Sequence, residues 1–136
     1  ISPKLAAVVC LGTTLGFFMT TPVIIALRAA SHICFALLGA VLIRKIPEII
    51  EKPLPSTVFN GGLAFVHALA EVAVVSPFFL AGSIFKPEQL ADGYVTSVLV
   101  LVGFGTFLHS LIDYTVSIML WKPVRAALPS LAELRE

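Results

Sequence analysis

The feature that most constrains this chain is an apolar stretch at residues 23–43 that contains Arg28 and His32. A helix rises about 1.5 Å per residue, so roughly 20 apolar residues cross the ~30 Å hydrocarbon core of a bilayer, and the stretch predicts a membrane-spanning helix. Arg28 and His32 stand at i and i+4 and therefore share one helix face. Because an arginine near mid-bilayer costs a few kcal/mol, we expect this face to contact a partner, a cavity or water, and not lipid.

The composition of the whole chain agrees with a membrane protein. Only 12% of the residues are charged and the mean hydropathy is +1.01, whereas about 25% of the residues are charged in an ordinary soluble domain. The formal net charge of +1 carries little information, because in a membrane protein the distribution of Lys and Arg between loops matters more than their total. Nothing in this composition favours nucleic acid as a partner.

Apolar runs separated by polar or proline-containing segments predict four transmembrane helices. The fold class expected is therefore all-α, a polytopic membrane helix bundle that forms a single transmembrane domain over residues 1–136. We expect the spans at about residues 4–20, 22–45, 56–80 and 94–121, with a polar tail at residues 123–136.

The basic residues indicate how the bundle is oriented. Four spans bring both ends of the chain to one side, and most of the basic residues that flank the spans lie on that side: Lys4, Arg44, Lys45, Lys52, Lys122 and Arg125. The opposite side carries Lys86 together with two acidic residues. The positive-inside rule then predicts that both ends of the chain are cytoplasmic.

Polar side chains inside the spans fall into two predicted layers. Counted from the outer helix ends, Arg28 lies roughly 8 Å deep, Glu71 and His32 roughly 13 to 14 Å, and His67 and His109 roughly 20 Å. We therefore expect Arg28, His32 and Glu71 to meet in the outer half of the membrane, with His67 and His109 below them. The upper layer is either an ion pair that only fixes helix packing or a ligand site open to the outside. For the lower layer, neutral imidazoles that bond across a helix interface are the simpler interpretation.

No motif for covalent chemistry accompanies these layers. The chain has no phosphate-binding glycine motif, no Cys/His metal-ligand spacing and no nucleophile elbow. His67 and Glu71, which share a helix face, resemble a proton-handling pair and are the one feature that favours an enzyme, but no nucleophile or metal-ligand set accompanies them. Because the motifs for covalent chemistry are missing, we expect no enzymatic activity, no bound metal and no cofactor.

Three phrases in the first two spans carry a family resemblance: GTTLGF at residues 12–17, LRAASH at 27–32 and ALLGA at 36–40. Together they resemble the substrate-binding S component of energy-coupling factor vitamin transporters, the niacin-type subfamily in particular. S components are six-helix membrane proteins that bind a vitamin near the outer face and dock onto a transmembrane coupling protein driven by two ATPases. The resemblance implies a multi-pass protein of a prokaryotic plasma membrane whose four spans correspond to the third through sixth family helices, the first two being absent.

The resemblance implies a subunit that captures niacin or a similar small aromatic carboxylate. Arg28 would hold the carboxylate through a bidentate pair of charge-assisted hydrogen bonds, and Glu71 would orient the arginine. His32 or His67 would bond the pyridine nitrogen.

Aromatic side chains complete the predicted site. Phe65, Phe104 or Phe107 would stack on the ligand ring, and His109 would lie in the layer below. The alternative is a small membrane scaffold without a ligand, in which the polar residues only lock the helices together.

Overall fold

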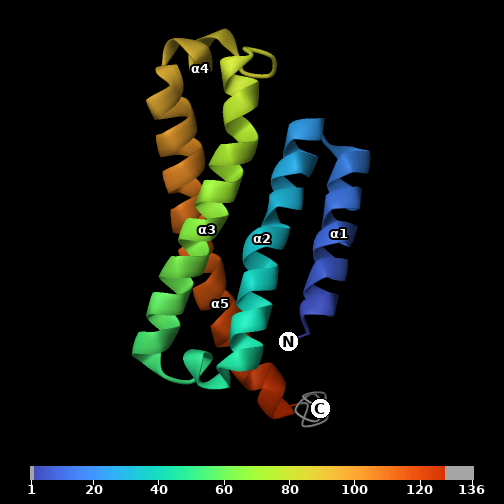
Figure 1. The fold of residues 1–136 in the computed structure, drawn as a ribbon, viewed down its shortest axis with the longest axis vertical. Coiled ribbons are helices and arrows are strands. Elements are labelled where there is room, and N and C mark those ends of the chain that lie inside the picture. The colour runs from blue at the N-terminus through green and yellow to red at the C-terminus, as the bar shows by residue number, and fades with distance from the viewer. Residues whose placement is uncertain (1, 128–136) are drawn as a thin grey trace.

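The computed structural model describes residues 2–127, apart from the side chains of Lys122 and Arg125, and this part of the chain forms helices without strands (Figure 1). Four of the helices are long and apolar enough to cross a membrane. The predicted all-α membrane bundle with four spans is thereby confirmed, and the chain is a multi-pass membrane protein.

The helices follow one another without long loops. The first three spans are α1 (Pro3–Thr20), α2 (Val23–Lys45) and α3 (Pro53–Leu80), and a short 3-10 helix, η1 (Pro47–Ile50), lies between α2 and α3. After α3 come the five-residue helix α4 (Pro87–Ala91) and the fourth span, which consists of η2 (Val95–Phe104) and α5 (Gly105–Ala127).

Prolines begin helices in this chain more often than they break them. Helix α3 begins at Pro53, three residues before the start expected at Ser56. A proline fits the first turn of a helix because the N–H groups there have no intrahelical partner. Ser56 therefore lies inside the first turn of α3, and its hydroxyl lies 2.9 Å from the Tyr114 hydroxyl on α5.

The fourth span departs from regular α-helix geometry. Residues Val95–Phe104 form a π-helix, and α5 then continues past Pro123 to Ala127, where the sequence predicted a polar tail. The rest of that predicted tail, residues 128–136, lies outside the described residues. A π-helix of this length is uncommon, and such segments occur often at functional sites.

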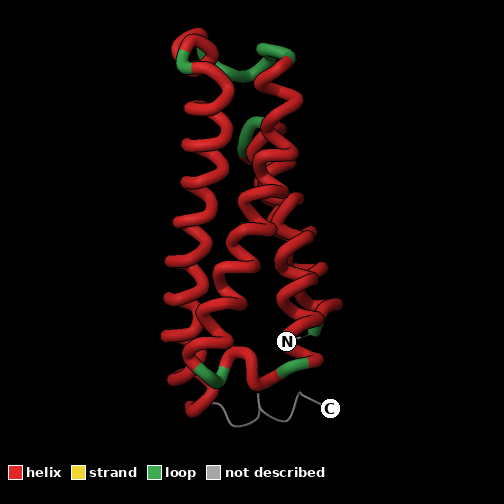
Figure 2. The backbone as a smooth tube through the Cα atoms, turned by 60° about the vertical axis from the view of Figure 1, so that its left-hand side comes forward, coloured by secondary structure: helices red, strands yellow, loops and turns green. Residues whose placement is uncertain are grey.

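Helix α3 lies at the centre of the bundle. It packs against α2 on one side and against η2 and α5 on the other, whereas α1 packs against α2. Figure 2 shows the long helices running roughly along one common axis, and the start of α1 and the end of α5 lie toward the same end of the bundle (Figure 1). The α2–α3 contact involves small residues, and a Cβ atom added at Gly39 would lie 3.0 Å from Leu63. Such close approach through small residues is typical of membrane helix pairs.

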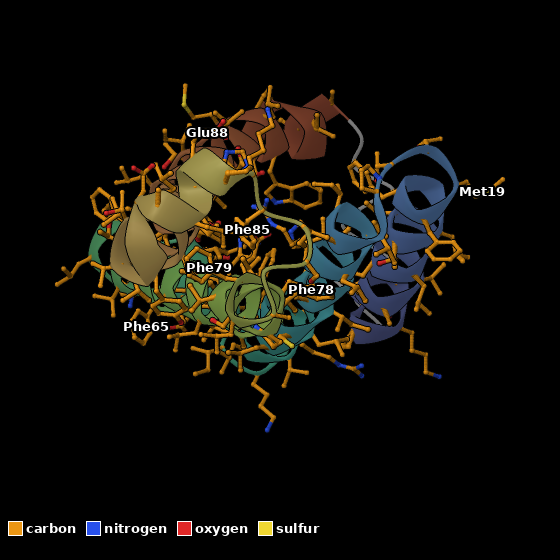
Figure 3. All side chains as sticks on the ribbon, turned by 90° about the horizontal axis from the view of Figure 1, so that it is seen from above. Met19, Phe65, Phe78, Phe79, Phe85 and Glu88 are labelled. Carbon is orange, nitrogen blue, oxygen red and sulfur yellow. The ribbon has the colours of Figure 1, made fainter. Side chains whose placement is uncertain are left out.

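Large apolar side chains cover the outside of the bundle. Met19 is 84% exposed and Phe65 58%, and Figure 3 shows both pointing away from the bundle. The completely buried side chains are few and mostly small, among them Ala26, Ala64 and Val75. This distribution suits a protein whose outer surface faces lipid instead of water.

Candidate functional site

Glu71 of α3 is the centre of a polar cluster inside the bundle. Its Oε2 accepts a hydrogen bond from Arg28 Nε at 2.7 Å and lies 2.5 Å from Arg28 Nη2. The hydroxyl of Thr106 on α5 donates a third bond to the same oxygen, at 3.2 Å. The contact between Arg28 and Glu71 that helix depth predicted is therefore present, and it joins α2 to α3.

The second carboxylate oxygen of Glu71 faces two histidines. His32 Nε2 lies 3.4 Å and His67 Nε2 3.5 Å from Oε1. The two imidazole rings meet edge to face, with their centroids 4.5 Å apart. On its other side His67 is fixed by Ser110 of α5, whose Oγ lies 2.6 Å from Nδ1. The cluster therefore contains residues from three of the four spans.

A cavity of about 610 Å³ adjoins this cluster. Its walls come mainly from α2, α3 and α5, and Arg28, His32, His67 and Glu71 all line it. The side chain of Arg28 is 35% exposed, whereas that of Glu71 is only 5% exposed. The arginine side chain is therefore partly exposed at the cavity wall, while a buried carboxylate holds its guanidinium group. A volume in this range suits a small organic ligand.

The aromatic residues at the cavity differ from those that the sequence analysis selected. Phe35 of α2 lines the cavity, and its ring lies 4.3 Å from the His67 ring with an interplanar angle of 31°. Phe17 of α1 lines the cavity as well. The predicted aromatic residues, Phe65, Phe104 and Phe107, are not among the lining residues.

Helix periodicity explains this difference. Arg28 and Phe35 are seven residues apart, so they share the face of α2 that meets the cavity. On the fourth span, His109 and Asp113 line the cavity. Phe104 precedes His109 by five residues and therefore projects to another side of the helix, where it is 56% exposed.

The two histidines that were expected to form a lower layer are separated. His67 lies in the cluster around Glu71 because the i and i+4 positions of a helix carry side chains that reach each other. His109 instead pairs with Asp113 on its own helix, with Nε2 2.9 Å from Oδ2. Both members of this second pair also line the cavity, although their side chains are 68% and 60% exposed.

Sequence reasoning missed Thr106 and Ser110, which hydrogen-bond to Glu71 and His67. Single hydroxyl groups are common in membrane helices, so their type carries no signal. Their spacing could have identified them. Residues 106, 109, 110 and 113 occupy one face of α5, and this face includes the more conspicuous His109 and Asp113.

Comparison with known proteins gives one informative match. No protein-family model and no solved structure matches the chain. Over 129 residues the chain is 34% identical to the niacin transporter NiaX of Lactococcus lactis subsp. cremoris (strain MG1363). The alignment covers 94% of this chain but 56% of NiaX, so the chain spans little more than half the length of that transporter. The alignment extends well beyond the first two spans of this chain. It confirms the predicted resemblance to niacin-type transporters.

Proposed function

We propose that this chain is a substrate-capture subunit for vitamin uptake that binds niacin or a similar small aromatic carboxylate in the cavity beside Glu71. The observation that carries the proposal is the partly exposed side chain of Arg28 at the cavity wall. Its Nε and Nη2 groups contact Glu71, which leaves Nη1 for a second anion. The similarity to a protein named niacin transporter supports the choice of ligand.

The chemistry of nicotinate matches the residues around the cavity. Its carboxylate would pair with Arg28, since a guanidinium binds carboxylates through directed, charge-assisted hydrogen bonds. Its flat ring would contact Phe35, which lines the cavity, at an edge or face. The pyridine nitrogen would accept a hydrogen bond from an imidazole N–H of His32 or His67.

The cellular setting of this capture subunit is also a proposal. The family resemblance supports a role as an S component that hands the vitamin to a transmembrane coupling protein and two ATPases in a prokaryotic plasma membrane. The distribution of basic residues supports cytoplasmic ends for this chain. In such an assembly the subunit binds its substrate and leaves it chemically unchanged, so we propose that it is no enzyme.

Ligand-dependent thermal stability of the purified protein tests the proposal. A ligand that binds only the folded state stabilises it by RT ln(1 + [L]/Kd), so stability should rise with nicotinate concentration. Nicotinamide, which lacks the carboxylate, should stabilise the protein much less. Arg28→Gln should remove the response to nicotinate, and Arg44→Gln, which changes an exposed arginine at the end of the same helix, should preserve it.

Two outcomes would contradict the proposal. Equal stabilisation by nicotinate and nicotinamide would exclude the role of Arg28 in reading the carboxylate. No stabilisation by either compound, combined with a loss of stability in Arg28→Gln, would instead favour a scaffold whose polar residues only lock the helices.

A further inference from the structure

Three ligating atoms converge on one point of the polar cluster. His32, His67 and Glu71 each offer one ligand atom, and these three atoms all lie within 4.8 Å of one another. Glu71 Oε1 faces Nε2 of both histidines. The contacts of Oε1 with the two nitrogens, at 3.4 and 3.5 Å, are longer than a normal N–H···O hydrogen bond. The ion pair with Arg28 uses Oε2, so Oε1 remains for another partner.

His67 provides an independent indication that something binds between these atoms. Its side chain is only 7% exposed, and its Nε2 is buried without a hydrogen-bond partner among the described residues. A buried polar atom left unpaired costs about 1–3 kcal/mol. When Nδ1–H donates to Ser110 Oγ, Nε2 directs a lone pair toward the carboxylate oxygen of Glu71. A cation between the two would satisfy both atoms.

We propose that His32, His67 and Glu71 form a binding site for a divalent transition-metal cation of the Zn²⁺ type. In a tetrahedral site the ligand atoms are separated by about 1.6 bond lengths, which is roughly 3.3–3.6 Å for Zn–N and Zn–O bonds of ~2.0–2.2 Å. The separations of Glu71 Oε1 from His32 Nε2 and His67 Nε2, 3.4 and 3.5 Å, fall within that interval. Two imidazoles and one carboxylate favour Zn²⁺, Co²⁺ or Ni²⁺ over Mg²⁺ and Ca²⁺, which prefer oxygen ligands.

The sequence predicted no bound metal, whereas the arrangement of His32, His67 and Glu71 favours one. The three residues come from two helices, so they do not form a short Cys/His motif that could be recognised in the sequence. The i and i+4 spacing of His67 and Glu71 was the available signal. Ser110 also fits such a site, because a metal-bound histidine usually donates its second ring N–H to a neighbouring acceptor that orients it.

A cation bound here would bear on the capture of an anion. Arg28 and Glu71 carry opposite charges, so a divalent cation would leave the site with a net positive charge next to the cavity. Three protein ligands also leave at least one coordination position open. If the proposed function holds, nicotinate and the cation should therefore raise each other's affinity, and by the same factor.

The test measures Zn²⁺ binding in the absence of nicotinate. Purified protein is stripped with EDTA, and Zn²⁺ binding is followed by equilibrium dialysis. We expect one saturable Zn²⁺ per chain, lost in His32→Gln, His67→Gln and Glu71→Gln. His109→Gln is the matched control, because His109 lines the same cavity and also pairs with a carboxylate four residues away, and it should retain the Zn²⁺. Ser110→Ala should weaken binding about 10- to 100-fold.

Two results would overturn the metal site: no saturable binding, or equal loss in His109→Gln. If the variants of the three ligand residues fail to fold, the absorption spectrum of Co²⁺ bound to the unchanged protein tests the metal site instead. A visible spectrum of four- or five-coordinate Co²⁺ supports the site, and a spectrum like that of hydrated Co²⁺ excludes it. Nicotinate binding measured in EDTA keeps the two proposals apart, since nicotinate binding without saturable Zn²⁺ would remove the metal site and leave the proposed function intact.

Discussion

At the scale of the residue, Glu71 determines the site because its two oxygens have different partners. Oε2 holds the guanidinium of Arg28 and Oε1 faces the two histidines. Within the apolar surroundings of a membrane helix, neither the arginine nor the carboxylate would be stable alone. The pair therefore stabilises the contact between α2 and α3 and keeps a positive charge at the cavity wall.

Replacing Glu71 by Gln should weaken the protein and strengthen its response to an anion. The change leaves the guanidinium without a counter-charge, which costs about 3–5 kcal/mol for a buried pair. Because Arg28 is 35% exposed, we expect the lower end of this range. The carboxylate of nicotinate would then supply part of the negative charge that Arg28 has lost. Thermal unfolding in EDTA should show a lower midpoint for Glu71→Gln and a larger upward shift with nicotinate than the unchanged protein shows.

The coupling between the two residues can be measured directly. A double-mutant cycle of Arg28→Gln and Glu71→Gln should give an interaction free energy of about 0.5–3 kcal/mol, because removing one member already removes the contact. Arg28→Gln alone should show no response to nicotinate. Strict additivity of the two single changes would mean that they do not interact in the membrane-embedded protein.

At the scale of the element, the sequence predicted what depends on hydrophobic length and missed what depends on local helix geometry. Four long apolar runs were sufficient to predict the four spans, because a bilayer requires a fixed length of apolar helix. The π-helix Val95–Phe104 was not predictable in this way, since hydropathy is the same for either hydrogen-bond pattern. The contact between Arg28 and Glu71 was predictable from the depth of the two residues in the membrane. The prediction that Phe104 stacks on the ligand considered depth alone and not the helix face, and Phe35 lines the cavity instead.

Two glycines of the fourth span test how tightly it packs on α3. A Cβ added at Gly103 would lie 3.0 Å from Val72 Cγ2, whereas at Gly105 it would meet nothing within 4 Å. Alanine favours a helix over glycine by about 1 kcal/mol, but valine is restricted at χ1 and cannot easily move aside. Gly103→Ala should therefore unfold more readily than Gly105→Ala, by about 1–3 kcal/mol. Equal stability of the two variants in thermal unfolding would show that α3 and η2 are not in close contact.

At the scale of the whole molecule, the position of the cluster along the bundle gives the site a direction. Glu71 is nine residues from Leu80 and 18 residues from Pro53, the two ends of α3, which corresponds to about 13 Å and 27 Å of helix. The cluster is therefore closer to the end of the bundle that carries α4 (Figure 1). Which compartment supplies the ligand depends on which side of the membrane that end faces.

Site-directed labelling decides the orientation. In a variant with Cys10 and Cys34 replaced by alanine, a single cysteine is introduced either by Glu88→Cys in α4 or by Glu48→Cys in η1, both exposed glutamates at opposite ends of the bundle. The positive-inside rule predicts that α4 faces outward, because Arg44, Lys45 and Lys52 lie near the η1 end. A membrane-impermeant maleimide should therefore label the Glu88→Cys protein in intact cells and the Glu48→Cys protein only after permeabilisation. The reverse pattern would place the polar cluster nearer the cytoplasm, where a subunit that collects a vitamin from outside would have its binding site on the wrong side of the membrane.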